Sequence, residues 1–118
     1  MNGLLSRRVG RRLARLGLGD VLLARGDRAG ARKLYDEANA ALARGNTRHR
    51  CTGLDRQGKL ALLENAIDRA RESFAEMVTL AHRTGFPPCE SQGRSGLASV
   101  AARRGEWASA DEEARRVV

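Results

Sequence analysis

Two histidines and two cysteines carry the most specific chemistry in this sequence. His49 lies two positions before Cys51, and His82 lies seven positions before Cys89. Zinc sites usually combine close pairs such as Cys-x-x-Cys or His-x-x-x-His, and a cysteine nucleophile needs an orienting third group and an oxyanion-stabilising loop. Neither pattern is present, so we predict no metal site and no cysteine catalysis. Without a secretory signal, both thiols are expected to be reduced and structural, and a disulfide bridge is the less favoured alternative.

The acidic residues and the glycines do not suggest an active site either. Glu72 and Glu76 lie four positions apart, and Arg69 precedes Glu72 by three. This spacing is typical of a solvated helix face. The glycines within 17–26 and 93–96 are not followed by Lys-Ser or Lys-Thr and follow no strand, as a phosphate-binding loop would require. We therefore expect a protein that is not an enzyme and needs no cofactor.

The N-terminal segment has the most uneven charge distribution. Residues 1–34 carry nine positive and two negative side chains, whereas residues 35–118 carry thirteen and twelve. Apolar residues three or four positions apart, from Leu5 to Leu16, form one stripe of a basic amphipathic helix. The arginines on the rest of its surface are candidate anion contacts: Arg7, Arg8, Arg11, Arg12 and Arg15. They are either merely solvated, or they attract nucleic-acid phosphates, an anionic membrane or an acidic partner.

The elements that position these side chains are expected to be helices. Aliphatic residues and alanine supply nearly all the apolar content, and only four of the 118 residues are aromatic. No stretch shows the period-two alternation of a strand, so the sequence predicts an all-α protein. The glycine, asparagine and proline positions then place helices near residues 3–25, 28–44, 48–64, 67–84, 89–104 and 107–117.

An internal repeat organises these helices, with three copies that lie 39 and 40 residues apart. Each copy begins with a small residue where one helix presses on another: Gly19, Gly58 and Ala98. Next comes a residue suited to the left-handed conformation of a hairpin turn: Gly26, Asn65 and Gly105. A second small position follows, expected to be buried within each pair: Ala31, Ala70 and Ala110. Four residues later the first two copies carry a large aromatic side chain, Tyr35 and Phe74, whereas the third has Ala114.

These marks resemble the tetratricopeptide repeat, whose signature pairs a Leu-Gly segment in one helix with Ala-x-x-x-aromatic in the next. The matching segments are Leu18-Gly19-x-x-Leu22 with Ala31-x-x-x-Tyr35, and Gly58-x-x-Ala61 with Ala70-x-x-x-Phe74. The resemblance covers about residues 11–118. The family's usual period is about 34 residues, so this chain is more similar to the longer-period arrays of actinobacterial antibiotic regulatory and maltose-activator type transcription regulators. Armadillo and HEAT repeats have a period near 40, but the turn and Ala-x-x-x-aromatic marks fit them less well.

The resemblance implies a right-handed α-solenoid of about three helical hairpins with period 39–40. We expect a single repeat domain spanning residues 1–118, with a basic extension at 1–12 that continues into the first helix. The repeats are expected at about 11–45, 47–85 and 88–118. By resemblance, exposed positions of the first helices would line a peptide- or protein-binding groove: Leu16, Asp20, Leu23, Asp55, Lys59, Leu62, Ser95, Ser99 and Arg103.

The sequence thus predicts a scaffold that binds a protein or peptide, as a regulatory or sensor module. One alternative is a basic nucleic-acid-associated protein that contacts phosphates through its first helix, although no aromatic side chains are interleaved there to stack on bases. Another is a fragment of a larger transcriptional regulator without activity of its own. The weak third copy predicts self-association through the C-terminal helix or a missing further helix.

The expected compartment is the cytoplasm. No segment approaches the roughly 18 uninterrupted apolar residues that span a bilayer. Arg15 and Asp20 interrupt the apolar stretch that an export signal would need behind its arginine pair. We therefore expect neither export nor a transmembrane segment.

Overall fold

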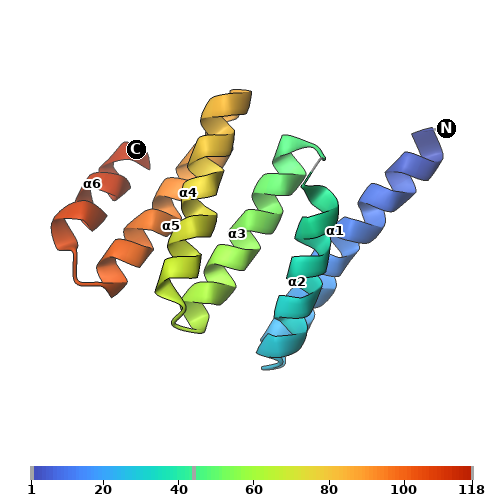
Figure 1. Cartoon of the computed structure of the whole chain (residues 1–118), viewed down its shortest axis with the longest axis horizontal. Coiled ribbons are helices and arrows are strands. Elements are labelled where there is room, and N and C mark those ends of the chain that lie inside the picture. The colour runs from blue at the N-terminus through green and yellow to red at the C-terminus, as the bar shows by residue number, and fades with distance from the viewer. Residues whose placement is uncertain (1, 44, 118) are drawn as a thin grey trace. The chain divides into compact units, whose positions relative to one another are not determined.

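The computed structural model describes residues 2–43 and 45–117, with side chains described from residue 10 onward. Over these residues it contains six helices and no strand, so the all-α prediction is confirmed (Figure 1). The helices are α1 (Asn2–Ala24), α2 (Arg28–Leu42), α3 (Thr47–Leu63), α4 (Ile67–Thr84), α5 (Pro87–Arg103) and α6 (Trp107–Val117). Every boundary lies within two residues of its predicted position.

The chain divides into two compact units, Met1–Gly53 and Leu54–Val118. The boundary falls inside α3. The first unit holds α1, α2 and the beginning of α3, and residues 2–12 of the basic segment form the first part of α1. The second unit holds the remainder of α3 together with α4, α5 and α6.

The turns between paired helices lie where the glycine and asparagine positions predict them. Gly26, Asn65 and Gly105 have φ angles of 88°, 59° and 72°, in the left-handed region that ends a helix. Asp27 then caps α2, because its carboxylate accepts a hydrogen bond of 2.9 Å from the backbone N–H of Gly30. Three short helix–turn–helix connections follow from these local preferences.

In the first unit, α1 packs against α2 (Figure 1), and Tyr35 of α2 is fully buried. The Tyr35 ring lies so close to Gly19 that a Cβ atom there would sit 2.5 Å from Cε1 of the ring. Asn39, one turn after Tyr35, donates its Nδ2 hydrogens to the carbonyls of Tyr35 and Gly53, both at 3.0 Å. The small residue predicted at Gly19 is therefore required by the aromatic side chain of its partner helix.

In the second unit, Phe74 of α4 takes the position of Tyr35 and is 1% exposed. A Cβ atom at Gly58 of α3 would lie 2.6 Å from the ring, and one at Gly96 of α5 would lie 2.2 Å from it. Gly93 of α5 meets the backbone carbonyl of Phe74 and the side chain of Val78. Glycines on two helices thus let α3 and α5 approach the same aromatic ring.

The third helical pair is more loosely packed than the others. Ala31 and Ala70 are completely buried, but Ala110 in α6 is only half-buried. Among the described residues of α6 none is buried, and Trp107 is 70% exposed. The expected burial of the small positions is confirmed for the first two copies and is wrong for the third, where Ala114 replaces the aromatic side chain.

The two cysteines depart from the sequence-based expectation. Cys51 and Cys89 are both buried, as expected for structural residues. Neither is a free thiol, however, and each is disulfide-bonded. The expectation of reduced thiols is therefore wrong for this structure.

Candidate functional site

A cavity of about 270 Å³ lies in the second unit, between α3 and α5 and against Phe74 of α4. The lining residues are Asp55, Lys59, Leu62, Phe74, Ser91, Gln92, Ser95, Gly96 and Ser99. Five of the positions predicted for a binding groove are among them: Asp55, Lys59, Leu62, Ser95 and Ser99. The structure thus brings together most of the predicted groove residues that belong to this unit.

The cavity combines an apolar inner wall with a hydroxyl-bearing edge. Phe74 and Leu62 supply the apolar surface, and Gly96, which has no side chain, lets α5 lie close against the ring. Ser91, Ser95 and Ser99 lie four residues apart on α5, so their hydroxyl groups form one row along the helix. The Ser99 hydroxyl donates to the carbonyl of Ser95 at 3.3 Å and keeps lone pairs that can accept a ligand's hydrogen bond.

Charge is concentrated on the α3 side of the cavity. The Asp55 carboxylate is 2.9 Å from the ammonium group of Lys59 and 3.6 Å from the guanidinium of Arg56. Asp55 is only 7% exposed, so its predicted exposure is wrong. The ion pair with Lys59 compensates part of the cost of burying the carboxylate. Lys59 remains 64% exposed and can reach a ligand from the rim.

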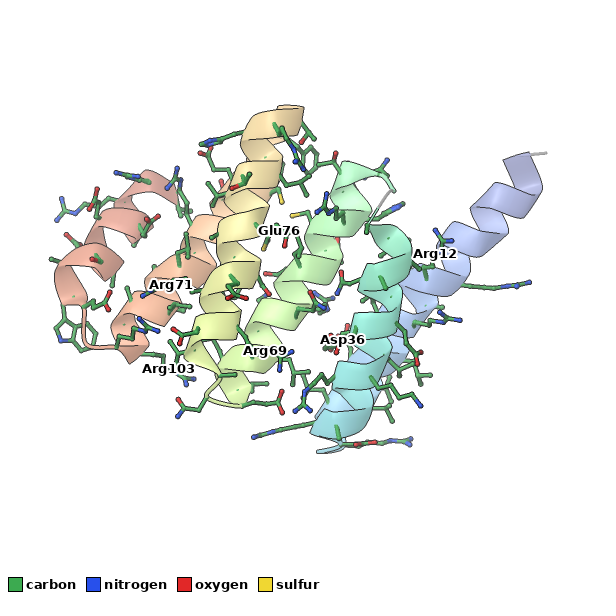
Figure 2. The ribbon with its side chains drawn as sticks, viewed as in Figure 1. Arg12, Asp36, Arg69, Arg71, Glu76 and Arg103 are labelled. Atoms are coloured by element: carbon green, nitrogen blue, oxygen red, sulfur yellow. The ribbon has the colours of Figure 1, made fainter. Side chains whose placement is uncertain are left out.

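Arg103, another predicted groove residue, is exposed at the end of α5 (Figure 2). Its Nη1 group donates to the backbone carbonyl of Leu62 at 3.1 Å. Leu62 lies in the last turn of α3, and its carbonyl also accepts a hydrogen bond of 3.0 Å from the backbone N–H of Asn65. Arg103 therefore caps α3 and fixes the position of one cavity-lining residue.

The three predicted groove residues of α1 belong to the first unit and do not line this cavity. Leu16 is 3% exposed, so its predicted exposure is wrong. It lies three residues before the buried Gly19, on the same side of α1. Asp20 and Leu23 are half-buried, and the Asp20 carboxylate accepts a hydrogen bond from the Tyr35 hydroxyl. In α1 these residues serve the packing of the first hairpin.

Three of the candidate anion contacts fall among the described side chains. Arg11 and Arg15 are exposed, and Arg12 is half-buried on α1 (Figure 2). The side chains of Arg7 and Arg8 lie outside the described residues. The exposed pair is accessible to an anion, but nothing in the described part of α1 gathers the arginines around a cavity.

A second, polar hollow of about 240 Å³ lies between α3 and α4. Gln57 and Ala61 line it from α3, and the α4 residues are Arg69, Glu72, Ser73 and Glu76. Arg69 and Glu76 are labelled on α4 in Figure 2. Because Arg69, Glu72 and Glu76 are all exposed to solvent, the interpretation of this surface as a solvated helix face is retained.

A charged network connects α4, α5 and α6 in the second unit. Glu90 of α5 contacts Nε2 of His82 and accepts a hydrogen bond from Nη2 of Arg94 at 3.3 Å, while Nη1 of Arg94 donates to Glu113 at 3.1 Å. The hydrogen bond from His82 is the main reason that the pKa of Glu90 lies below its usual value. Burial alone would lower the pKa of Arg94, but the hydrogen bonds to Glu113 and Glu90 raise it overall.

Sequence reasoning missed four of the cavity-lining residues as site residues: Phe74, Ser91, Gln92 and Gly96. The repeat pattern assigns Phe74 only to the large aromatic position of the second copy. The clearest available signal was the Gly93-x-x-Gly96 spacing inside a predicted helix, because interior glycines weaken a helix and often mark a close backbone approach.

Comparisons of this chain with protein-family models, with curated proteins and with solved structures gave no match. In the described part of the chain, no helix is both long enough and apolar enough to cross a membrane. No group of three or more His, Cys, Asp or Glu residues within that part is arranged to hold a metal ion.

Proposed function

We propose that this chain is a tetratricopeptide-like repeat scaffold, rather than an enzyme, which binds a segment of a partner protein in the cavity between α3 and α5. The observation that carries the proposal is the convergence of Lys59 and Leu62 from α3 with Ser95 and Ser99 from α5 around the Phe74 ring. A regulatory or sensor module in the cytoplasm, with hairpins stacked as a right-handed solenoid, is the setting that the repeat pattern favours.

The size and lining of the cavity favour a peptide side chain over a free small molecule. Pockets for drug-sized ligands are commonly about 300–1,000 Å³, so a cavity of about 270 Å³ lies just below that range. An aliphatic or aromatic side chain would fill the space against Phe74 and Leu62. The peptide backbone would then lie along the row of Ser91, Ser95 and Ser99, where hydroxyl groups can exchange hydrogen bonds with amides.

The proposal can be tested by selecting peptides from a random 12-residue display library on the immobilised chain. Binding of the selected peptides is then measured by fluorescence anisotropy with the wild type and with Ser99→Phe, which places a ring in the cavity. We expect at least a tenfold loss of affinity. Thr79→Phe is the matched control, because Thr79 is exposed on α4 and does not line the cavity.

Two results would argue against this function. One is a selection that yields no binder, and the other is a set of peptides that bind the Ser99→Phe variant as tightly as the control. Salt dependence distinguishes nucleic-acid binding from peptide binding. The affinity for phosphates falls steeply between low and moderate salt, whereas the affinity of an apolar contact does not. Duplex DNA that binds more tightly than any selected peptide, with such a salt dependence, would favour the arginine-rich first helix as the functional surface.

A further inference from the structure

The charged groups around the α3–α5 cavity are mostly positive. Of its nine lining residues, only Asp55 and Lys59 are charged. The Asp55 carboxylate lies 2.9 Å from the ammonium group of Lys59 and 3.6 Å from the guanidinium of Arg56. Arg103 adds a third cation at the end of α5, where its Nη1 group donates to the carbonyl of Leu62 (Figure 2). Three positive charges and one negative charge leave an excess of two positive charges beside the apolar wall.

Lys59 and Arg103 keep hydrogen-bond donors for a further anion. The side chain of Lys59 is 64% exposed, and its contact with Asp55 needs only one of the three N–H donors of the ammonium group. A guanidinium has five N–H donors. The hydrogen bond from Arg103 to Leu62 uses one of them, on a neutral carbonyl rather than on a carboxylate. A carboxylate brought to the rim of the cavity can therefore accept hydrogen bonds from either side chain.

Carboxylates elsewhere in the second unit do not neutralise Arg103. Asp68 of α4 contacts Arg104, and Glu106 lies 3.8 Å from Arg71. Among the described residues no carboxylate contacts Arg103, whose hydrogen bond goes to the backbone. The positive charge at this end of α5 is thus available to a ligand.

The two cations lie beside the apolar part of the cavity. Lys59 precedes Leu62 by three residues, so both side chains lie on one side of α3. Arg103 follows Ser99 by four residues and continues the row of serine hydroxyls on α5. A peptide whose backbone follows this row, with an apolar side chain against Phe74, would therefore pass close to both cations.

We propose that the partner segment bound in this cavity is acidic. An apolar side chain fills the space against Phe74, and an Asp or Glu a few residues away binds Lys59 and Arg103. This inference rests on the proposed function, since it names the chemistry of the segment that the same cavity binds. A basic segment is disfavoured, because Asp55, the single acidic residue of the lining, is buried and already shared by Lys59 and Arg56.

Selection from the random display library tests the inference when it is run at about 0.15 M salt, where exposed charges more than about 8 Å apart are largely screened. Selected peptides should be enriched in Asp and Glu. Each peptide is then synthesised with an amidated C-terminus, so that its carboxylates belong to side chains, and is compared with a version in which Asp and Glu become Asn and Gln. The amide version should bind the wild type about fivefold more weakly, because partly solvated ion pairs each contribute modestly.

A pair of charge-matched variants locates the carboxylate. Lys59→Gln combined with Arg103→Gln removes the two proposed contacts. Lys33→Gln combined with Arg83→Gln removes two charges from exposed positions that do not line the cavity. The acidic and amide peptides should differ by less than about twofold on the first variant and by about fivefold on the control. Wild-type affinity of the first variant for the amide peptide checks that its cavity is intact.

The possible failures are distinguishable from one another. Selected peptides that lose affinity for Ser99→Phe but show no acidic enrichment, or whose amide versions bind the wild type equally well, would overturn this inference and leave the proposed function intact. An unchanged preference for the acidic peptide in the variant lacking Lys59 and Arg103 would place the carboxylate elsewhere on the basic surface, and would also overturn it. Absence of any peptide that is sensitive to Ser99→Phe would reject both proposals.

Discussion

Replacing Gly96 by alanine should destabilise this protein although alanine is the better helix former. The added Cβ atom would lie 2.2, 2.3 and 2.5 Å from Cδ1, Cγ and Cε1 of the Phe74 ring. The ring is 1% exposed and is also contacted by Gly58, so it has little space into which to move. A side chain or a helix must therefore shift.

The size of the effect follows from two opposing contributions. Overpacking a filled core costs about 1–3 kcal/mol. Alanine in place of glycine within a helix recovers about 0.8–1.0 kcal/mol. We therefore expect Gly96→Ala to lower the free energy of unfolding, by up to about 2 kcal/mol. The repeat-equivalent change Gly17→Ala meets nothing within 4 Å and should raise it, by up to about 1 kcal/mol.

Urea unfolding followed by circular dichroism measures both changes, at one low protein concentration so that association does not contribute. A double variant, Gly96→Ala with Phe74→Leu, provides an internal check because the smaller side chain leaves room for the new methyl group. Its loss of stability should be less than the sum of the two single losses. Equal stabilisation by Gly96→Ala and Gly17→Ala would refute the close approach of α4 and α5 at this ring.

Two further predictions concern polar contacts. Asn39→Ala removes the hydrogen bonds from Nδ2 to the Tyr35 and Gly53 carbonyls. It should reduce the free energy of unfolding by about 1–2 kcal/mol. An unchanged midpoint of urea unfolding would contradict this role of Asn39. Glu90→Gln should lower the thermal midpoint at pH 7, and by progressively less as the pH falls below 4.5. The pKa of Glu90 is lowered from its usual 4.5 mainly by the hydrogen bond with His82, so its contribution is present above pH 4.5 and is lost as the pH falls through the folded-state pKa. A difference between variant and wild type that does not shrink anywhere in the acid range below pH 4.5 would exclude this contribution.

The helices and their turns could be predicted from the sequence because local preferences decide them. Gly26, Asn65 and Gly105 are the residues that most easily adopt a left-handed conformation, and each occupies a hairpin turn. Asp27 caps α2 for the same kind of local reason, because its side chain can accept a hydrogen bond from the first turn of the helix. The packing of Gly19 against Tyr35 could also be predicted, because the repeat places a small residue and a large one at fixed offsets in the sequence.

Exposure at individual positions was harder to predict, because it depends on which side of a helix its neighbours cover. Leu16 and Asp55 occupy equivalent repeat positions, and both were assigned to an exposed surface by resemblance. Leu16 is instead buried on the side of α1 that carries Gly19, and Asp55 is buried beside Lys59. The oxidation state of Cys51 and Cys89 was likewise inaccessible, since it depends on which side chains meet in three dimensions.

The contact of Phe74 with both Gly58 and Gly96 has a consequence for how the second unit unfolds. In repeat proteins, stability is approximately the sum of a term for each repeat and a term for each interface between neighbours. The Phe74 ring lies against α3 within its own hairpin and against α5 of the next one, so it contributes both to the stability of the hairpin and to that of the interface. The core of the α3–α4 hairpin is therefore complete only when α5 is packed against it. Amide hydrogens of α4 and α5 should consequently exchange in a single cooperative opening. Helix α6, which has no buried residue in its described part, should exchange earlier in an opening of its own.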